Sequence, residues 1–221
     1  TETQARALKS RLEAIPNVAS VTFISRDEAM EDFKAQYPDE ELFQDLDPEI
    51  LEGLITEKTC AILPVHVYGC LCDADAIQAV ADRHGLKVIY DAAHAFGERV
   101  NGVSVARLGD ASMFSFHATK VYNTIEGGAV CYSDEELGRR LYRLKNFGIM
   151  DEETVDYVGA NAKMNEFQAA MGLCNLKHVD GEIARRKAVV DRYRANLDGV
   201  RGVQLSKVQD GVKLSLIHIS E

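Results

Sequence analysis

The stretch that decides the fold is residues 60–91, CAILPVHVYGCLCDADAIQAVADRHGLKVIYD. It begins with an apolar segment, Cys60–Val67, whose composition predicts a buried strand. A helix is then predicted between Asp73, a side chain suited to capping a helix N-terminus, and Gly85, a residue typical of helix C-termini. Leu86–Tyr90 predicts the next strand. Because the three elements follow one another through short turns, they predict two parallel strands covered by a helix.

The same alternation of strands and helices continues beyond this stretch. Two more short strands are expected at Met113–Phe116 and Ala129–Tyr132. Helical spacing of apolar residues predicts helices at Glu135–Leu144, around Met164–Leu176 and at Ile183–Leu197. The expected fold class is α/β, with a mainly parallel sheet and flanking helices.

The first 50 residues do not follow this alternation. They predict a helix at Gln4–Ile15, a strand at Val18–Ser25 and a second helix at Arg26–Gln36, which together make a small α+β segment. They also hold 12 acidic and 5 basic side chains, of 35 and 25 in the whole chain. This uneven charge predicts a domain boundary near residue 50.

Composition excludes several classes of partner. The net charge of −10 disfavours nucleic acid and anionic membranes, which bind mainly to clustered lysine and arginine. The longest apolar run starts at Cys60 and is far shorter than the ~18 residues of a membrane-spanning helix. The 5 cysteines are scattered and odd in number, which indicates a reducing compartment, the cytoplasm. No metal site is expected, because Cys70 and Cys72 have no second cysteine pair at zinc-binding spacing.

Two residue types suited to covalent chemistry follow the predicted strands. Asp91 ends one strand, at the edge where open parallel sheets place functional groups, and Lys120 follows the next. A partly desolvated lysine can form a Schiff base with an aldehyde cofactor, while a nearby carboxylate can keep a pyridine nitrogen protonated. His94 lies between the two, and the hydroxyl of Ser115 suits a phosphate group.

A plainer interpretation stays open from these residue types alone. Asp91 would cap a helix that follows it, and Lys120 would be a solvated lysine in a loop. His66 and His117 flank the proposed site without a partner at metal-ligand spacing, so packing or substrate contact is expected of them.

Five segments resemble the DegT/DnrJ/StrS sugar aminotransferases in order and spacing. They are LPVHVYG (63–69), DAAHAFG (91–97), SFHATK (115–120), EGG (126–128) and NAKMNEFQAA (161–170). The resemblance covers about residues 51–200. It implies a fold-type-I transferase core that uses pyridoxal 5'-phosphate.

The resemblance also implies a role for each candidate residue. Lys120 would carry the cofactor as a Schiff base, and Asp91 would pair with the pyridinium nitrogen. His94 would contact the ring-oxygen side of the cofactor, and Ser115 its phosphate. Asn161 matches an asparagine that reaches the cofactor phosphate of the neighbouring subunit, which implies a homodimer with a shared active site.

The implied reaction is a ping-pong transamination. An amino donor, usually L-glutamate in this family, would displace Lys120 from the cofactor, and the freed amine would act as general base and acid. The acceptor would be a keto-sugar attached to a nucleoside diphosphate. A dehydratase of the same family carries histidine in place of the lysine, so Lys120 argues against that alternative.

Residues 1–50 resemble a different family. The segments LEAIPNV (12–18) and VTFISRDEAM (21–30) are similar to the extracytoplasmic domain of the cell-division protein FtsX. The last eight residues, LSLIHISE (214–221), look like a translated sequencing adapter. We therefore expect a chimeric chain, with a foreign segment 1–50, an aminotransferase core 51–200 truncated at both ends, and a tail 201–221.

This organisation bears on activity. The phosphate-binding loop and the cofactor-stacking aromatic residue of the family are not found before residue 51, so weak or no activity is expected of this polypeptide. The alternative is a non-catalytic fragment or binding module with an FtsX-like segment. Absorbance of bound cofactor distinguishes the two hypotheses.

Overall fold

The structure, a computed structural model, describes residues 48–201, 203 and 212–213. The chain divides into two compact units between Asp47 and Pro48, and the described residues all belong to the second unit. The elements expected in residues 1–47 and the adapter-like end at 214–221 lie outside the described residues.

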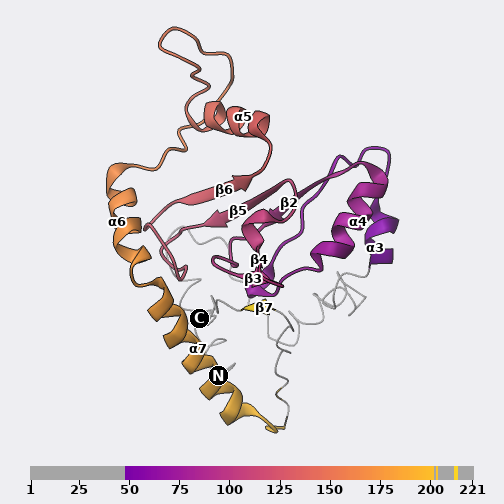
Figure 1. Cartoon of the computed structure of the whole chain (residues 1–221), viewed down its shortest axis with the longest axis vertical. Coiled ribbons are helices and arrows are strands. Elements are labelled where there is room, and N and C mark those ends of the chain that lie inside the picture. Colours follow the sequence, from indigo (N-terminus) through magenta and orange to yellow (C-terminus); the bar gives the residue numbers. More distant parts are fainter. Residues whose placement is uncertain (1–47, 202, 204–211, 214–221) are drawn as a thin grey trace, which may run out of the picture. The chain divides into compact units, whose positions relative to one another are not determined.

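A four-stranded sheet carries the candidate site (Figure 1). Its strands lie in the order β1 (Ala61–Ile62), β2 (Lys87–Asp91), β5 (Ala111–Ser115) and β6 (Gly128–Tyr132). β1 and β2 are parallel, as are β2 and β5, whereas β6 runs antiparallel to β5. The expected α/β class with a mainly parallel sheet is therefore confirmed.

The helix that connects β1 to β2 is α4 (Ala74–His84), and both of its predicted caps are confirmed. The side chain of Asp73 accepts a hydrogen bond from the main-chain N–H of Ala76 (3.0 Å). Gly85 ends the helix in the left-handed conformation, with φ of 63°. These caps place the turn into β2 directly after the last helical residue.

The core beneath α4 is apolar. Val88 and Tyr90 of β2 are buried in one cluster with Ile77 and Val80 of α4. Complete burial of a valine side chain such as Val80 stabilises the fold by roughly 1.5 to 3 kcal/mol. This packing fixes the direction of β2 and therefore the position of its last residue, Asp91.

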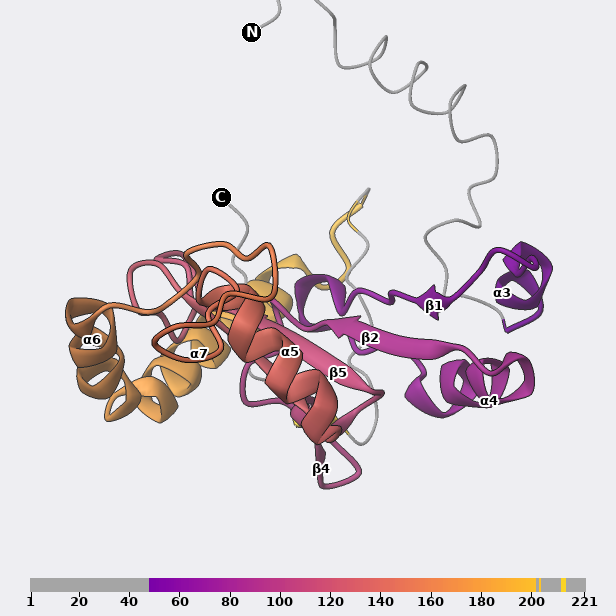
Figure 2. The same ribbon diagram turned by 90° about the horizontal axis from the view of Figure 1, so that it is seen from above.

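A short helix, α3 (Pro48–Leu54), packs beside α4 (Figure 2). The carboxylate of Glu52 lies 2.7 Å from Arg83 and 2.6 Å from His84, at the end of α4. Hydrogen bonds from Arg83 and His84 lower the pKa of Glu52 to about 2. The ion pairs join the first described helix to the rest of the unit.

The long strand predicted at Cys60–Val67 is wrong in extent. Strand β1 has two residues, and beyond it only Val65 pairs again, as a single bridge to Asp91. Proline interrupts the ladder because Pro64 has no N–H to donate, although its carbonyl accepts from the N–H of Asp91 (2.9 Å). The chain then enters a 3-10 turn at Val67–Gly69.

A second, three-stranded antiparallel sheet was not predicted. Its order is β4 (Val103–Ser104), β3 (Arg99–Val100) and β7 (Val212–Lys213). Asn101 and Gly102 connect β3 to β4 in the left-handed conformation typical of a tight hairpin turn. Strands of two residues show no readable periodicity, so no pattern of residues predicted them.

The three remaining helices lie close to their predicted positions. They are α5 (Glu135–Lys145), α6 (Glu166–Leu176) and α7 (Val179–Leu197). Residues 146–164, here called the arm, form the long connection that projects beyond α5 (Figure 1). Within the described part of the chain, none of the helices is long and apolar enough to cross a membrane.

Candidate active site

Asp91 stands in a row of accessible side chains that crosses the sheet. It pairs with Val65 on one side and with Met113 on the other, and Met113 pairs with Val130. Paired residues in a sheet point to the same face. The three apolar neighbours are 42%, 38% and 44% exposed. The carboxylate therefore lies on an open, largely apolar surface.

Main-chain hydrogen bonds hold Asp91 in place. Its carbonyl accepts from the N–H of His66 (2.9 Å), and the N–H of Ala92 donates to the carbonyl of Met113 (2.8 Å). The Oδ1 atom of Asp91 accepts from the N–H of Ala93 (3.0 Å). Residues 92–97 form turns and no helix, so the alternative that Asp91 caps a helix is wrong.

Lys120 lies in the loop between β5 and β6, which is closed by its own hydrogen bonds. The N–H of Phe116 donates to the carbonyl of Gly127 (2.8 Å), and the N–H of Thr124 donates to the carbonyl of Phe116 (2.9 Å). The N–H of Lys120 donates to the carbonyl of His117 (2.9 Å). The side chain of Lys120 is half-buried. A closed loop of this kind fixes the lysine more firmly than a solvated loop would.

An aromatic cluster connects this loop to the turn after Asp91. Phe96 stacks on Tyr122 with ring centroids 4.6 Å apart. Phe96 also forms edge-to-face pairs with Phe116 and Phe114, with ring centroids 5.7 Å and 6.3 Å apart. Pairs of this geometry contribute about 0.5 to 1.5 kcal/mol beyond burial. Sequence reasoning missed the cluster, because Phe96 was noted only as part of a motif.

His94 is the residue on which Asp91 and Lys120 both act. Burial lowers its pKa, and the positive charge of Lys120 lowers it further, while the negative charge of Asp91 opposes both. The main-chain N–H of Tyr68 donates to Nδ1 of His94 (3.1 Å), and the two rings stack with centroids 5.8 Å apart. Asp91 and Lys120 therefore both lie within electrostatic range of His94. Sequence reasoning gave Tyr68 no role.

The other two predicted residues lie in different places. Ser115 ends β5 two residues after Met113, so it faces the same side of the sheet as Asp91, and its Oγ accepts from the N–H of His117 (3.3 Å). Asn161 lies on the arm, where its Oδ1 accepts from Nζ of Lys163 (2.8 Å). Ser115 therefore lies on the same face of the sheet as Asp91, whereas Asn161 lies on the arm, a different segment of the chain.

His66 and His117 have structural partners. His66 is fully buried, stacks on Tyr90 (4.8 Å), and accepts at Nδ1 from the N–H of Cys72 (3.1 Å). Burial lowers the pKa of His66 to about 4, which keeps it neutral at pH 7. His117 lies 3.5 Å from the carboxylate of Glu126. Packing, one of the two roles expected of His66, is what the structure shows.

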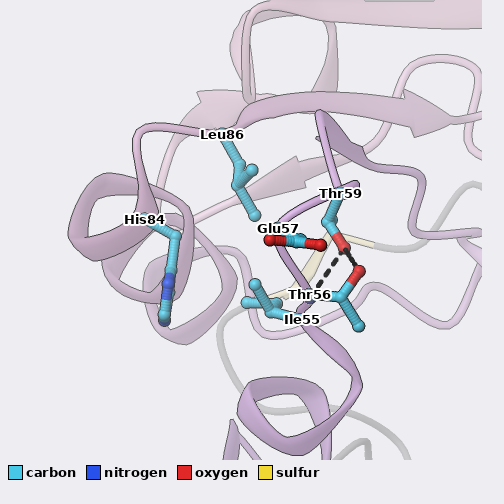
Figure 3. Close-up of a pocket in the computed structure, with 6 residues that line it drawn as sticks. All are labelled: Ile55, Thr56, Glu57, Thr59, His84 and Leu86. Carbon is cyan, nitrogen blue, oxygen red and sulfur yellow. Dashed lines mark hydrogen bonds between the residues drawn. The ribbon is translucent and has the colours of Figure 1, made fainter.

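A hollow of about 420 Å³ lies elsewhere on the described unit. Its lining residues surround the segment before β1 and the turn before β2 (Figure 3). They are Ile55, Thr56, Glu57, Thr59, His84 and Leu86. These positions precede the amino ends of the strands, whereas Asp91 and Lys120 follow the carboxyl ends. The hollow is therefore separate from the candidate site.

Several sequence relatives carry the names of sugar-nucleotide enzymes. One is the dTDP-4-amino-4,6-dideoxy-D-glucose transaminase of Shigella dysenteriae, 46% identical over 165 residues, which are 75% of this chain and 45% of that enzyme. Another is the GDP-perosamine synthase of Caulobacter vibrioides, 42% identical over 154 residues, or 69% of this chain and 42% of the relative. The chain spans less than half the length of these relatives.

Solved structures and a family model agree with the relatives. DesI, crystallised in the presence of its TDP-sugar product, is 41% identical, with a TM-score of 0.70 over 76% of this chain and 43% of its own. Spr1654 of Streptococcus pneumoniae, solved in its PLP form, is 28% identical, with a TM-score of 0.72 over 79% of this chain and 51% of its own. The model of the DegT/DnrJ/EryC1/StrS aminotransferase family matches residues 14–220. The chain belongs to that family.

Proposed function

We propose that this chain carries the lysine-bearing part of the active site of a pyridoxal-phosphate aminotransferase that acts on a nucleotide-linked keto-sugar. The observation that carries the proposal is the convergence of Asp91, His94 and Lys120 at the carboxyl ends of β2 and β5. The relatives named as sugar-nucleotide transaminases support the substrate class. Aminotransferases of this family depend on pyridoxal phosphate.

The residues at the site fit this cofactor. The exposed apolar row around Asp91 suits one face of an aromatic ring, and the carboxylate suits a protonated ring nitrogen. The hydroxyl of Ser115 suits a phosphate oxygen. When bound, pyridoxal phosphate supplies an aldehyde for the amine of Lys120 and a ring that accepts electrons.

Lys120 then moves the proton. Its Nζ, once released from the cofactor, would take a proton from the α-carbon of the amino donor and deliver it to the carbon on the other side of the amino nitrogen, two bonds away. Asp91 stabilises the positive ring nitrogen throughout. The hydrogen bonds that close the lysine loop hold the main chain that carries this side chain.

The amino donor in this proposal is L-glutamate, and the partner is a second copy of the chain. Asn161 on the arm would reach the cofactor phosphate of that copy. Two apolar side chains of α6, Phe167 (87% exposed) and Leu173 (68% exposed), support a partner surface there. All five cysteines are free thiols, which supports a location in the cytoplasm.

Absorbance of the 221-residue chain mixed with pyridoxal phosphate tests the first half of the proposal. We expect a visible band that free cofactor lacks, with loss of this band in Lys120→Ala. Lys145→Ala is the matched control, because this lysine sits at the end of α5 and contacts the ring of Tyr142. A band that survives Lys120→Ala would refute the assignment.

Transfer of the amino group tests the second half. The chain is incubated with L-glutamate, pyridoxal phosphate and a panel of nucleotide-linked keto-sugars, and 2-oxoglutarate is measured. We expect slow formation that depends on a keto-sugar and on Lys120. Formation of 2-oxoglutarate that persists unchanged in Lys120→Ala contradicts the aminotransferase assignment.

A further inference from the structure

The turn that carries Tyr68 has an unusual backbone. Tyr68 has φ of 53° and ψ of 26°, which is the left-handed region. This conformation costs a residue with a side chain about 1 kcal/mol, and such strain concentrates at functional sites. Gly69 follows with φ of 75°, and a Cβ at this position would lie 2.7 Å from Oε1 of the buried Glu98. The turn is therefore held tightly against the interior.

Two contacts made by Tyr68 in this conformation act on His94. Its main-chain N–H points at Nδ1 of the imidazole (3.1 Å), and its phenol ring lies nearly parallel to the imidazole, at 11°. The first contact fixes which nitrogen carries a proton. The stacked phenol ring restricts rotation of the imidazole of His94 about its Cβ–Cγ bond.

The chemistry of the hydrogen bond decides the tautomer. A main-chain N–H can only donate, so Nδ1 must accept and cannot carry a proton. A neutral imidazole then carries its single proton on Nε2 and donates from that atom. We propose that Tyr68 is a positioning residue that holds His94 as a neutral imidazole protonated on Nε2.

The surrounding charges agree with a neutral ring. Lys120, from the loop between β5 and β6, and Asp91, at the end of β2, are the charged groups that act on His94. Burial and Lys120 outweigh Asp91, so the pKa of His94 lies below its ordinary value.

The consequence at the site rests on the proposed function. An Nε2–H donor suits an anionic ring oxygen of the cofactor, which needs a hydrogen-bond donor and gains nothing from an acceptor. A ring free to exchange tautomers would present an acceptor for part of the time. Tyr68 would thus keep the donor in place before any ligand arrives.

Nuclear magnetic resonance of the cofactor-free chain tests the tautomer without any activity. Long-range proton–nitrogen correlation spectra are recorded at pH 7.5 on the full chain with ¹⁵N-labelled histidine, and His94→Gln assigns the signal. We expect the pattern of an acceptor at Nδ1 and a protonated Nε2. His66, which accepts at Nδ1 from Cys72, gives the same pattern as an internal reference. The exposed His178 provides the solvated comparison.

Three variants separate the two contacts. Tyr68→Phe keeps both and should leave the pattern unchanged. Tyr68→Gly keeps the N–H without the ring, so the tautomer should persist while the pKa of His94 moves towards its ordinary value. Tyr68→Pro removes the N–H and, because proline cannot adopt a φ of 53°, also displaces the turn that aims it, so it should give averaged tautomers, with an unchanged His66 signal as evidence of folding.

Two results would overturn the inference. Averaged nitrogen signals or a protonated Nδ1 in the unaltered chain would do so, whatever the variants show. A single Nε2–H pattern in Tyr68→Pro with His66 intact would show that another group sets the tautomer. The result is independent of cofactor absorbance, so failure here and failure of the proposed function are distinguishable.

Discussion

At the scale of single residues, His66 links the stability of the described unit to pH. Its ring is fully buried and its pKa is lowered by burial from 6.5 to about 4. The unfolded chain takes up a proton below about pH 6.5, whereas the folded chain does so only near pH 4. The contribution of His66 to the free energy of unfolding is therefore fully present above pH 6.5. It is lost as the pH falls to 4, a decrease of roughly 2 to 3 kcal/mol.

Urea unfolding at pH 7 and pH 5 measures this effect, with His66→Phe as the control. The variant keeps a ring to stack on Tyr90 but has no group that titrates. It should be less stable at both pH values, because the N–H of Cys72 loses its acceptor, and it should lose less stability between them. Equal pH dependence in both proteins would contradict the account.

The residues of the site show what sequence can and cannot reveal. Asp91 and Lys120 were predicted from their residue types at the ends of strands, which left a plainer interpretation open, and from the resemblance of their motifs to the aminotransferase family. Tyr68 was not, because its importance lies in a left-handed main-chain conformation and a contact across 26 residues. No local pattern of residue types encodes such a contact.

At the scale of elements, helix α6 supports the lysine loop. The side-chain amide of Asn175 donates to the carbonyl of Asn123 (2.9 Å), and the amide of Asn123 donates to the carbonyl of Lys120 (3.2 Å). Loss of one such hydrogen bond costs about 1 kcal/mol. Asn175→Ala should therefore weaken cofactor binding roughly five-fold in an absorbance titration.

Cys174→Ala is the matched control for this titration. Its side chain is exposed on the same helix, one residue away, so cofactor affinity should not change. Affinity of Asn175→Ala equal to that of the unaltered chain would show that α6 does not hold the loop.

The conformation of the arm requires two glycines at points where one stretch of its main chain passes close to another. A Cβ on Gly148 would lie 1.7 Å from the carbonyl oxygen of Tyr157, and one on Gly159 would lie 2.4 Å from the main-chain nitrogen of Gly148. Gly148→Ala should open the arm, since no side chain fits there. The N–H of Asp156 donates to the carbonyl of Gly148, and its hydrogen exchange should accelerate tenfold or more. A tenfold change corresponds to a loss of about 1.4 kcal/mol in the free energy of local opening.

Gly181→Ala tests whether any glycine replacement has this effect. Gly181 lies in α7 with open space around its Cα, so alanine should leave the exchange in the arm unchanged. Unchanged exchange in Gly148→Ala as well would mean that the crossing is not a structural requirement.

Elements with several turns or an unbroken apolar run could be predicted, and the others could not. The caps of α4 at Asp73 and Gly85 fixed its limits, and β2 followed from its apolar residues. The strand predicted over Cys60–Val67 was too long, because Pro64 lies within this apolar run and has no N–H to donate. The β3–β4–β7 sheet depends on pairing between residues about 110 positions apart, which local sequence does not encode.

At the scale of the whole molecule, the proposed shared site predicts complementation between two inactive chains. Lys120→Ala removes the cofactor lysine, and Asn161→Ala removes the proposed phosphate contact to the partner. A mixed dimer holds one site with both residues intact, so an equal mixture should regain roughly a quarter of the native sites. Tight cofactor binding is the readout, and a mixture no better than its components would contradict the shared site.

Lys120 is the residue that we expect to bond to the cofactor, and chemical labelling tests this directly. The chain is mixed with pyridoxal phosphate, reduced with borohydride to make the bond permanent, digested, and mapped by mass spectrometry. We expect the added mass on the peptide that contains Lys120, and we expect this label to disappear in Lys120→Ala. Specific labelling of another lysine, such as Lys145 or Lys163, or no specific labelling, would contradict it.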